Sequence, residues 1–105
     1  MVARVTTYEN VDLALADGLD RWISSLDEDP FKALPGYEGS MTLVDRDNAR
    51  VIGIGFYASA GDAGEVEARM TELMGQAAGM LPKELLPALA MQPESVGVYD
   101  VAQRD

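Results

Sequence analysis

Hydrophobic and polar residues alternate in four short segments of the chain, and in two other segments the hydrophobic residues recur at every third or fourth position. Alternation is typical of a β-strand with one buried face, because successive side chains of a strand point to opposite sides. The alternating segments predict strands over residues 2–8, 37–44, 50–58 and 95–102.

The spacing between the first two strands predicts an amphipathic helix. Asn10 is a residue type that caps helices, and Pro30 disfavours helical geometry in the residue before it, so the helix is expected to begin after Asn10 and to end near Asp29. Its apolar stripe comprises Val11, Leu15, Leu19, Trp22, Ile23 and Leu26.

A second helix is predicted after the third strand. Asp62 and Glu65 have the spacing of a capping box, and Gly79 is a typical helix end. The apolar stripe of this helix comprises Val66, Met70, Leu73, Met74 and Ala77. Proline residues punctuate the segment that follows, which leaves room for a short helix around residues 84–89.

The predicted order of elements is β-α-β-β-α-β, the ferredoxin-like arrangement of the α+β class, in one domain over residues 1–105. Its four-stranded antiparallel sheet carries both helices on one face. The other face is then bare, and something must cover it.

Gly53, Gly55 and Ala58 match the G-x-G-x-x-A spacing of a dinucleotide-binding turn. Such a turn needs a buried strand before the glycines and a helix that begins inside the motif, whereas here the alternation continues through the glycines. The stretch is therefore interpreted as a strand, with Ile52, Ile54 and Phe56 on one face and Gly53, Gly55 and Tyr57 on the other. Because glycines permit close approach of another backbone, we expect them to face a second subunit.

Composition excludes several classes of function. Asp and Glu total 18 against 8 Lys and Arg, for a net charge of −10, which disfavours nucleic acid and anionic membranes as partners. The chain has no Cys and no His, so disulfides, thiolate nucleophiles, Ser-His-Asp triads and Cys- or His-based zinc sites are absent. The segment DRDNAR begins like a calcium loop, but Arg50 and Phe56 stand where that loop needs Gly and Glu, so no metal site is predicted.

The apolar runs are too short to span a bilayer. The first ten residues, MVARVTTYEN, contain no hydrophobic core of a signal peptide, so a cytoplasmic location is expected.

The segment PGYEGSMTLVDRDNARVIGIGFYAS, residues 35–59, resembles the second and third strands of the antibiotic biosynthesis monooxygenase-like (ABM) proteins. The similar features are Pro35-Gly36 before Tyr37, then Gly39, Asp45-Arg46 and the pair Tyr57 and Ser59. The resemblance implies a dimeric α+β barrel, in which two copies pack through their open sheet faces and each keeps a pocket between sheet and helices. Activities in this family include cofactor-independent oxygenation of aromatic polyketide-like substrates, quinol oxidation and haem degradation.

The chain departs from the family in places that bear on activity. Tyr57 stands where family members commonly carry Trp. Haem-degrading members rely on an Asn of the first strand and on a Trp and a His of the second helix. The corresponding strand position here is Thr7, and Val66 and Gln76 lie near where the Trp and the His would fall, so haem degradation by that route is excluded.

Four side chains are candidates to line the pocket: Trp22, Phe56, Met70 and Met74. Ordinary core packing is the alternative for the helix residues among them. Tyr57 and Thr7 are weak catalytic candidates, with an interface role and a simple strand role as their alternatives. Arg4 pairs either with an acidic ligand or with a carboxylate of a neighbouring strand or subunit.

Three functions remain open at this point. The first is cofactor-independent monooxygenation of an aromatic or quinol-type small molecule, in which the substrate supplies the electrons. The second is non-catalytic binding of a small molecule, and the third is a structural dimerisation module. No cofactor is required by any of them.

Overall fold

The computed structural model describes residues 1–26 and 30–103. Its strands are β1 (Val2–Tyr8), β2 (Tyr37–Asp45), β3 (Arg50–Tyr57) and β4 (Ser95–Asp100). Its α-helices are α1 (Leu13–Ser24), α2 (Ala60–Gly64) and α3 (Val66–Ala78), and two short 3₁₀ helices complete it, η1 (Pro30–Ala33) and η2 (Lys83–Ala90).

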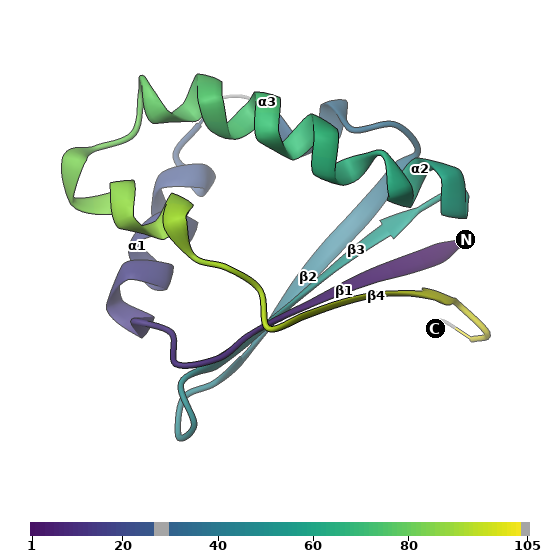
Figure 1. The fold of residues 1–105 in the computed structure, drawn as a ribbon, viewed down its shortest axis with the longest axis horizontal. Helices are drawn as coiled ribbons and strands as arrows, with labels where there is room; N and C mark the ends of the chain where they lie inside the picture. The colour runs from purple at the N-terminus through teal and green to yellow at the C-terminus, as the bar shows by residue number, and fades with distance from the viewer. Residues whose placement is uncertain (27–29, 104–105) are drawn as a thin grey trace.

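The strands form one antiparallel sheet in the order β2-β3-β1-β4. All helices lie on the same side of this sheet (Figure 1). This is the ferredoxin-like arrangement, so the predicted fold class is confirmed. None of the helices in the described ranges is both long and apolar enough to cross a membrane.

The helix starts differ from the sequence prediction. Asp12, not Asn10, caps α1, and its side chain accepts a hydrogen bond of 3.3 Å from the Leu15 amide. Asn10 instead adopts a positive φ of 53°, a conformation that Asn tolerates better than most residues and that turns the chain from β1 toward α1. Ser59 caps the second helical region, so Asp62 lies in its first turn rather than at its cap.

The hydrophobic core lies at one end of the sheet. Val2 and Tyr57 of the strands pack there against Ala63 and Val66 of the helices, with Leu34 from the connecting segment. α1 buries no residue fully and packs against η2, beside rather than flat on the sheet (Figure 1). The helical layer therefore closes tightly over one end of the sheet and stands off from the other.

The register shows which strand residues share a face. Gly55 lies opposite Arg4, Gly53 opposite Thr6, and Tyr57 opposite Val2. Because Tyr57 and Val2 belong to the core beneath the helices, this whole set faces the helices. The expectation that the glycines face a second subunit is wrong.

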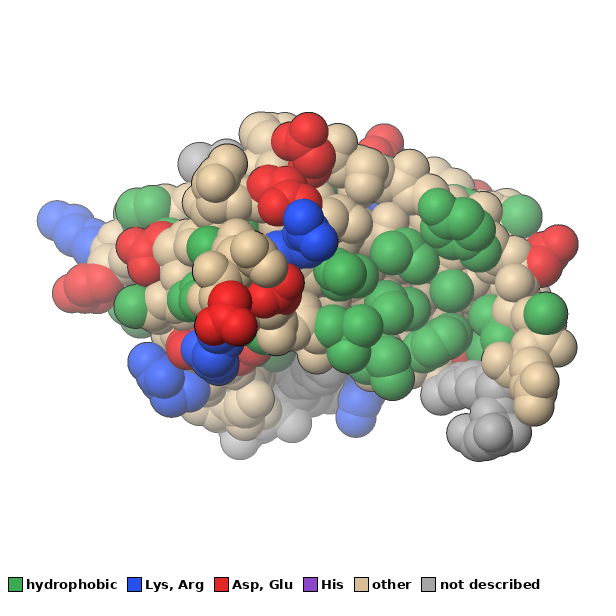
Figure 2. Space-filling view, turned by 90° about the horizontal axis from the view of Figure 1, so that it is seen from below, with side chains coloured by type: hydrophobic (Ala, Val, Ile, Leu, Met, Phe, Trp, Pro, Cys, Tyr) green, Lys and Arg blue, Asp and Glu red, His purple; other side chains and the backbone are tan. Residues whose placement is uncertain are grey.

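The opposite, open face carries the other set of alternating residues. Ile52, Ile54 and Phe56 of β3 lie there, next to Met41 and Leu43 of β2 and Ala3 and Val5 of β1. Seen from this side, hydrophobic side chains gather into a continuous patch over the sheet (Figure 2). The sequence prediction chose the wrong face because a strand's apolar set usually faces its own helices, whereas here it faces outward.

Candidate functional site

A cavity of about 340 Å³ lies between the covered face of the sheet and the helices. Its floor is formed by β1, β2 and β3, and α1 and α3 contribute its other walls. Gly53 has no side chain, and a Cβ atom added there would meet nothing within 4 Å, so the space above this part of the floor is open. Pockets for small organic molecules begin at about 300 Å³, so the space suits a compact ring system.

Tyr57 forms one end of this cavity and depends on a glycine to do so. A Cβ atom on Gly55 would lie 2.8 Å from the Tyr57 hydroxyl oxygen, so the tyrosine ring lies across the position that a side chain would occupy. The ring of Tyr37 packs edge-on against it, with centroids 6.1 Å apart. Tyr37 in turn donates a hydrogen bond of 3.0 Å to the Ser40 hydroxyl.

Arg4 supplies positive charge to the cavity floor. Its side chain is 17% exposed, and it donates a hydrogen bond of 3.1 Å to the Thr6 hydroxyl. A second guanidinium nitrogen lies 3.7 Å from the Glu67 carboxylate of α3. The structure thus gives Arg4 an ion pair to a helix of its own subunit, where the sequence left a neighbouring strand, a second subunit and an acidic ligand open.

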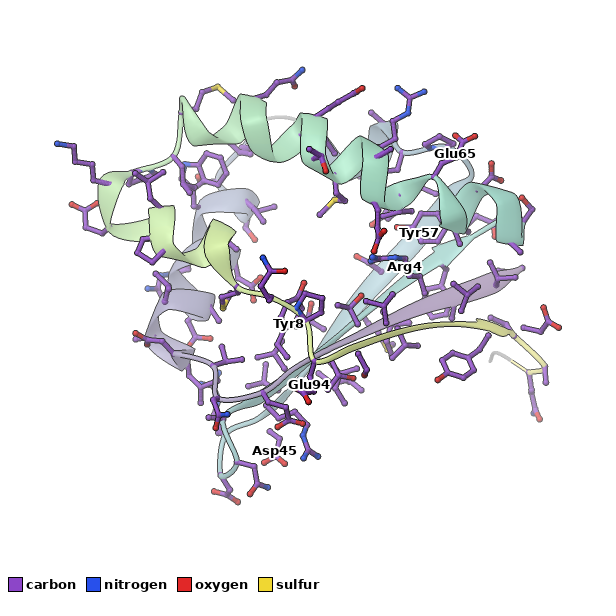
Figure 3. All side chains as sticks on the ribbon, viewed as in Figure 1. Arg4, Tyr8, Asp45, Tyr57, Glu65 and Glu94 are labelled. Carbon is purple, nitrogen blue, oxygen red and sulfur yellow. The ribbon has the colours of Figure 1, made fainter. Side chains whose placement is uncertain are left out.

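The phenols beside Arg4 keep their protons. Burial raises the pKa of Tyr57, and the nearby Arg4 charge opposes that rise in part. Burial likewise raises the pKa of Tyr8, again with Arg4 acting in the opposite direction. Both hydroxyls are therefore hydrogen-bond donors at neutral pH. Figure 3 shows Arg4, Tyr8 and Tyr57 extending from the sheet toward the helices.

Two carboxylates of α1 also line the cavity, Asp17 and Asp20. Asp17 accepts two hydrogen bonds, of 3.2 and 3.3 Å, from the Arg46 guanidinium in the β2–β3 hairpin. Within residues 1–26 and 30–103, no three carboxylates cluster closely enough to hold a metal ion.

Two of the candidate pocket residues line the cavity, Trp22 of α1 and Met70 of α3. The side chain of Met74 lies outside the described part of the structure. Phe56 does not line the cavity, because it lies on the open face of the sheet. Thr7 lies on that face too, opposite Ile52, so it is also outside the pocket.

Sequence reasoning missed several residues that line the cavity, above all Thr6, Tyr8 and Tyr37. A signal for the first two was present. Arg4, Thr6 and Tyr8 alternate along β1, so three polar or amphipathic side chains share one face of the strand, which is unusual for residues that pack in a core.

The fold is shared with known oxygenases. A monooxygenase from the gene ActVA-Orf6 of Streptomyces coelicolor, solved with the ligand nanaomycin D, matches 99% of this chain and 89% of its own, with 16% identity and a TM-score of 0.64. SnoaB, a cofactor-independent oxygenase from Streptomyces nogalater, matches 98% of this chain and 94% of its own, with 14% identity and a TM-score of 0.55. The chain has the ABM fold.

The resemblance noted in residues 35–59 is thereby confirmed for the fold of nearly the whole chain. No model of a known protein family matches the sequence, and a search of curated proteins finds no match. At these identities the ABM likeness concerns the architecture, and activity has to be argued from the pocket.

Proposed function

We propose that this protein binds a hydroxylated aromatic small molecule in the cavity and oxygenates it without a cofactor. The observation that supports this most directly is the character of the covered sheet face. It is hollowed at Gly53 and bordered by the protonated hydroxyls of Tyr8 and Tyr57, and the Trp22 ring provides an aromatic wall. An inert core would fill this space with aliphatic side chains.

The reaction suited to such a pocket draws its electrons from the substrate. An anthrone-type methylene that has lost a proton gives an electron to O₂, and the resulting radical pair combines into a carbon–oxygen bond. The peroxide, once protonated, loses water and leaves a carbonyl group. One oxygen atom enters the product and the other leaves as water, so R₂CH₂ and O₂ become R₂C=O and H₂O.

The protein's part in this reaction is to orient the substrate and to stabilise negative charge on oxygen. Tyr57 and Tyr8 donate hydrogen bonds to the anionic oxygens of substrate and peroxide, where negative charge develops during the reaction. Trp22 and Met70 hold the flat apolar body of the ligand. The two oxygenases of the same fold lend this proposal support, one of them having been solved with nanaomycin D.

The same proposal includes a homodimer through the open sheet face. Met41 and Leu43 of the edge strand β2 are 49% and 48% exposed there, beside Ile54 and Ile52 of β3. Monomeric proteins rarely leave so continuous a hydrophobic surface in water. A second copy, related by a twofold axis, covers it with the same residues.

Oxygen uptake with dithranol, a dihydroxyanthrone, tests the proposed activity after the spontaneous rate is subtracted. The wild-type protein should accelerate uptake and release an anthraquinone. Gly53→Leu fills the floor of the cavity and should reduce the catalysed rate at least about tenfold, because it removes space that the ligand needs.

Gly75→Leu is the matched control for that variant. Gly75 lies on α3, and a Cβ atom there also meets nothing within 4 Å. It should leave the rate unchanged. Saturable binding of dithranol without oxygen uptake would reduce the function to ligand binding, whereas equal rates for the two leucine variants would contradict the assignment of the pocket.

A further inference from the structure

One feature of the cavity is the isolation of its positive charge. Arg4 is the only cation among the described residues that line the cavity, in a protein whose net charge is −10. A guanidinium remains charged at every physiological pH, even when it is largely withdrawn from water. An arginine that lies largely withdrawn from water on the floor of a pocket therefore needs negatively charged or oxygen-rich partners.

The partners that the described residues provide leave part of this need unmet. The Thr6 hydroxyl is neutral, and the Glu67 oxygen at 3.7 Å is too distant for a good charge-assisted hydrogen bond. The Glu67 side chain is also 77% exposed, so water screens the pair and the carboxylate is held loosely. A ligand oxygen can compete with Glu67 for this guanidinium.

A second donor lies next to Arg4. Gly55 is the residue of β3 directly opposite Arg4, and the Tyr57 ring lies over Gly55. Because Gly55 has no side chain, nothing on that strand separates the Tyr57 hydroxyl from the guanidinium. In Figure 3 the two side chains lie together beneath α3. A ligand oxygen placed here receives hydrogen bonds from a cation and from a protonated phenol.

The far end of the cavity has the opposite character. Asp17 and Asp20 lie on α1, and Arg46 neutralises the first of them near the β2–β3 hairpin. The hairpin directly precedes Arg50 and Val51, and Val51 pairs with Tyr8, so the hairpin lies roughly 13 Å or more along β1 from Arg4. A ligand with one acidic end is attracted at Arg4 and repelled by the unpaired charge of α1, which fixes its direction.

We propose that Arg4 and Tyr57 form an anion-recognition subsite, and that the pocket selects aromatic molecules whose acidic group, a carboxylate or an ionised phenol, pairs with Arg4. The proposal rests on the same cavity as the proposed function and adds the charge and orientation of the ligand. Glu67 acts as a displaceable partner that occupies Arg4 until the ligand arrives.

Two probes of equal size test the selection, both followed by fluorescence anisotropy. Anthracene-9-carboxylate carries the charge, and anthracene-9-carboxamide is its neutral counterpart. The wild-type protein should bind the carboxylate at least about tenfold more tightly. An ionisable hydroxyanthraquinone, titrated across its own pKa, then separates phenolate from carboxylate recognition, and tighter binding of its anion extends the subsite to phenolates.

Variants assign the preference to Arg4. Arg4→Met should abolish it, and Arg4→Lys should restore part of it. Glu67→Gln should raise the affinity for the carboxylate by up to about fivefold, because it removes the competing carboxylate. Loss of folding cannot produce that gain. Arg69→Met removes an equal charge from the exposed side of α3 and should change neither affinity.

Equal binding of the two probes, a preference that survives Arg4→Met, or no saturable binding of either probe would each overturn the proposal. None of these measurements requires turnover. A carboxylate preference without oxygen uptake from dithranol would therefore leave the subsite standing while the oxygenase function fails. Oxygen uptake without any charge preference would support the oxygenase function and overturn the anion-recognition subsite.

Discussion

The two faces of the sheet have exchanged their usual roles. The face beneath the helices, which in most α+β folds is the apolar one, carries Arg4, Thr6 and Tyr8 and encloses a hollow. The face without helices carries Ile52, Ile54 and Leu43. Hydrophobic side chains on the open face need a second molecule to shield them from water, because no helix in the described part of this chain packs there (Figure 1). The polar side chains of the covered face support the proposed ligand pocket, while Val2 and Tyr57 at the other end of the same face pack in the hydrophobic core.

The largest expected effect comes from placing a charge on the open face. Leu43→Glu puts a carboxylate within the apolar set of the open face, next to Ile52, where a second copy would have to bury it unpaired. An unpaired buried charge costs about 3 kcal/mol or more, so we expect dimer dissociation to become at least about 100-fold easier. Native mass spectrometry over a dilution series measures this.

Gln76→Glu is the control for that variant, since it adds the same charge to the exposed surface of α3 on the other side of the molecule. It should leave the assembly unchanged. A wild-type protein that is monomeric at every concentration would contradict the proposed dimer through the open face. A Leu43→Glu dimer as tight as the wild type would move the interface elsewhere.

Substitutions on the covered face should have a smaller effect than Leu43→Glu, and two neighbouring glycines of this face are expected to respond differently. Gly55→Ala brings a methyl group to 2.8 Å from the Tyr57 ring, which is 4% exposed and enclosed by Tyr37 and the core. Overpacking of this kind costs about 1–3 kcal/mol of unfolding free energy, measurable by urea denaturation. Gly53→Ala, two residues away, meets open space and should be neutral or slightly stabilising.

A double variant tests whether the Gly55 effect acts through the tyrosine. If the ring is the obstacle, Gly55→Ala should cost less in a Tyr57→Leu background than in the wild type, because the branched chain can leave the position over Gly55. Equal costs in the two backgrounds would show that the loss of stability arises within β3 and not from contact with the Tyr57 ring.

The strands could be predicted from the sequence, but the face that each set of side chains occupies could not. The alternation in residues 2–8 and 50–58 is a local property, so the strands and their order were predictable, and with them the sheet. Alternation divides a strand into two sets of side chains but does not say which set faces the helices. That choice depends on what covers each face, and the local sequence pattern contains no information about a second molecule.

The errors in the predicted site follow from assigning the two sets of strand side chains to the wrong faces. Phe56 and Thr7 were expected in or near the pocket, and both belong to the open set. Tyr57 belongs to the covered set with the glycines, and only the three-dimensional structure shows its ring lying over Gly55. The ion pair of Arg4 with Glu67 joins residues of β1 and α3, and nothing in the local sequence pattern indicates that these two meet.

The smallest expected effect concerns alkaline pH and again distinguishes the covered face. Burial raises the pKa of Tyr57 above the ordinary value of about 10 for a phenol. The contribution of this shift to stability is fully present below that value. As the pH rises past it, unfolded chains lose the phenolic proton while folded chains retain it, so the free energy of unfolding falls until the folded pKa is passed. Tyr57→Phe should make this decline shallower, by less than the cost of Gly55→Ala.

The slope of unfolding free energy between pH 9 and pH 11, rather than its absolute value, is the quantity to compare, since any packing loss in Tyr57→Phe is common to all pH values. Arg4→Met should have the opposite effect on the slope, because the Arg4 charge opposes the rise in the Tyr57 pKa and its removal allows burial to raise that pKa further. A decline that is identical in the wild type and both variants would mean that Tyr57 meets water freely, and the end of the cavity formed by its ring would then be open.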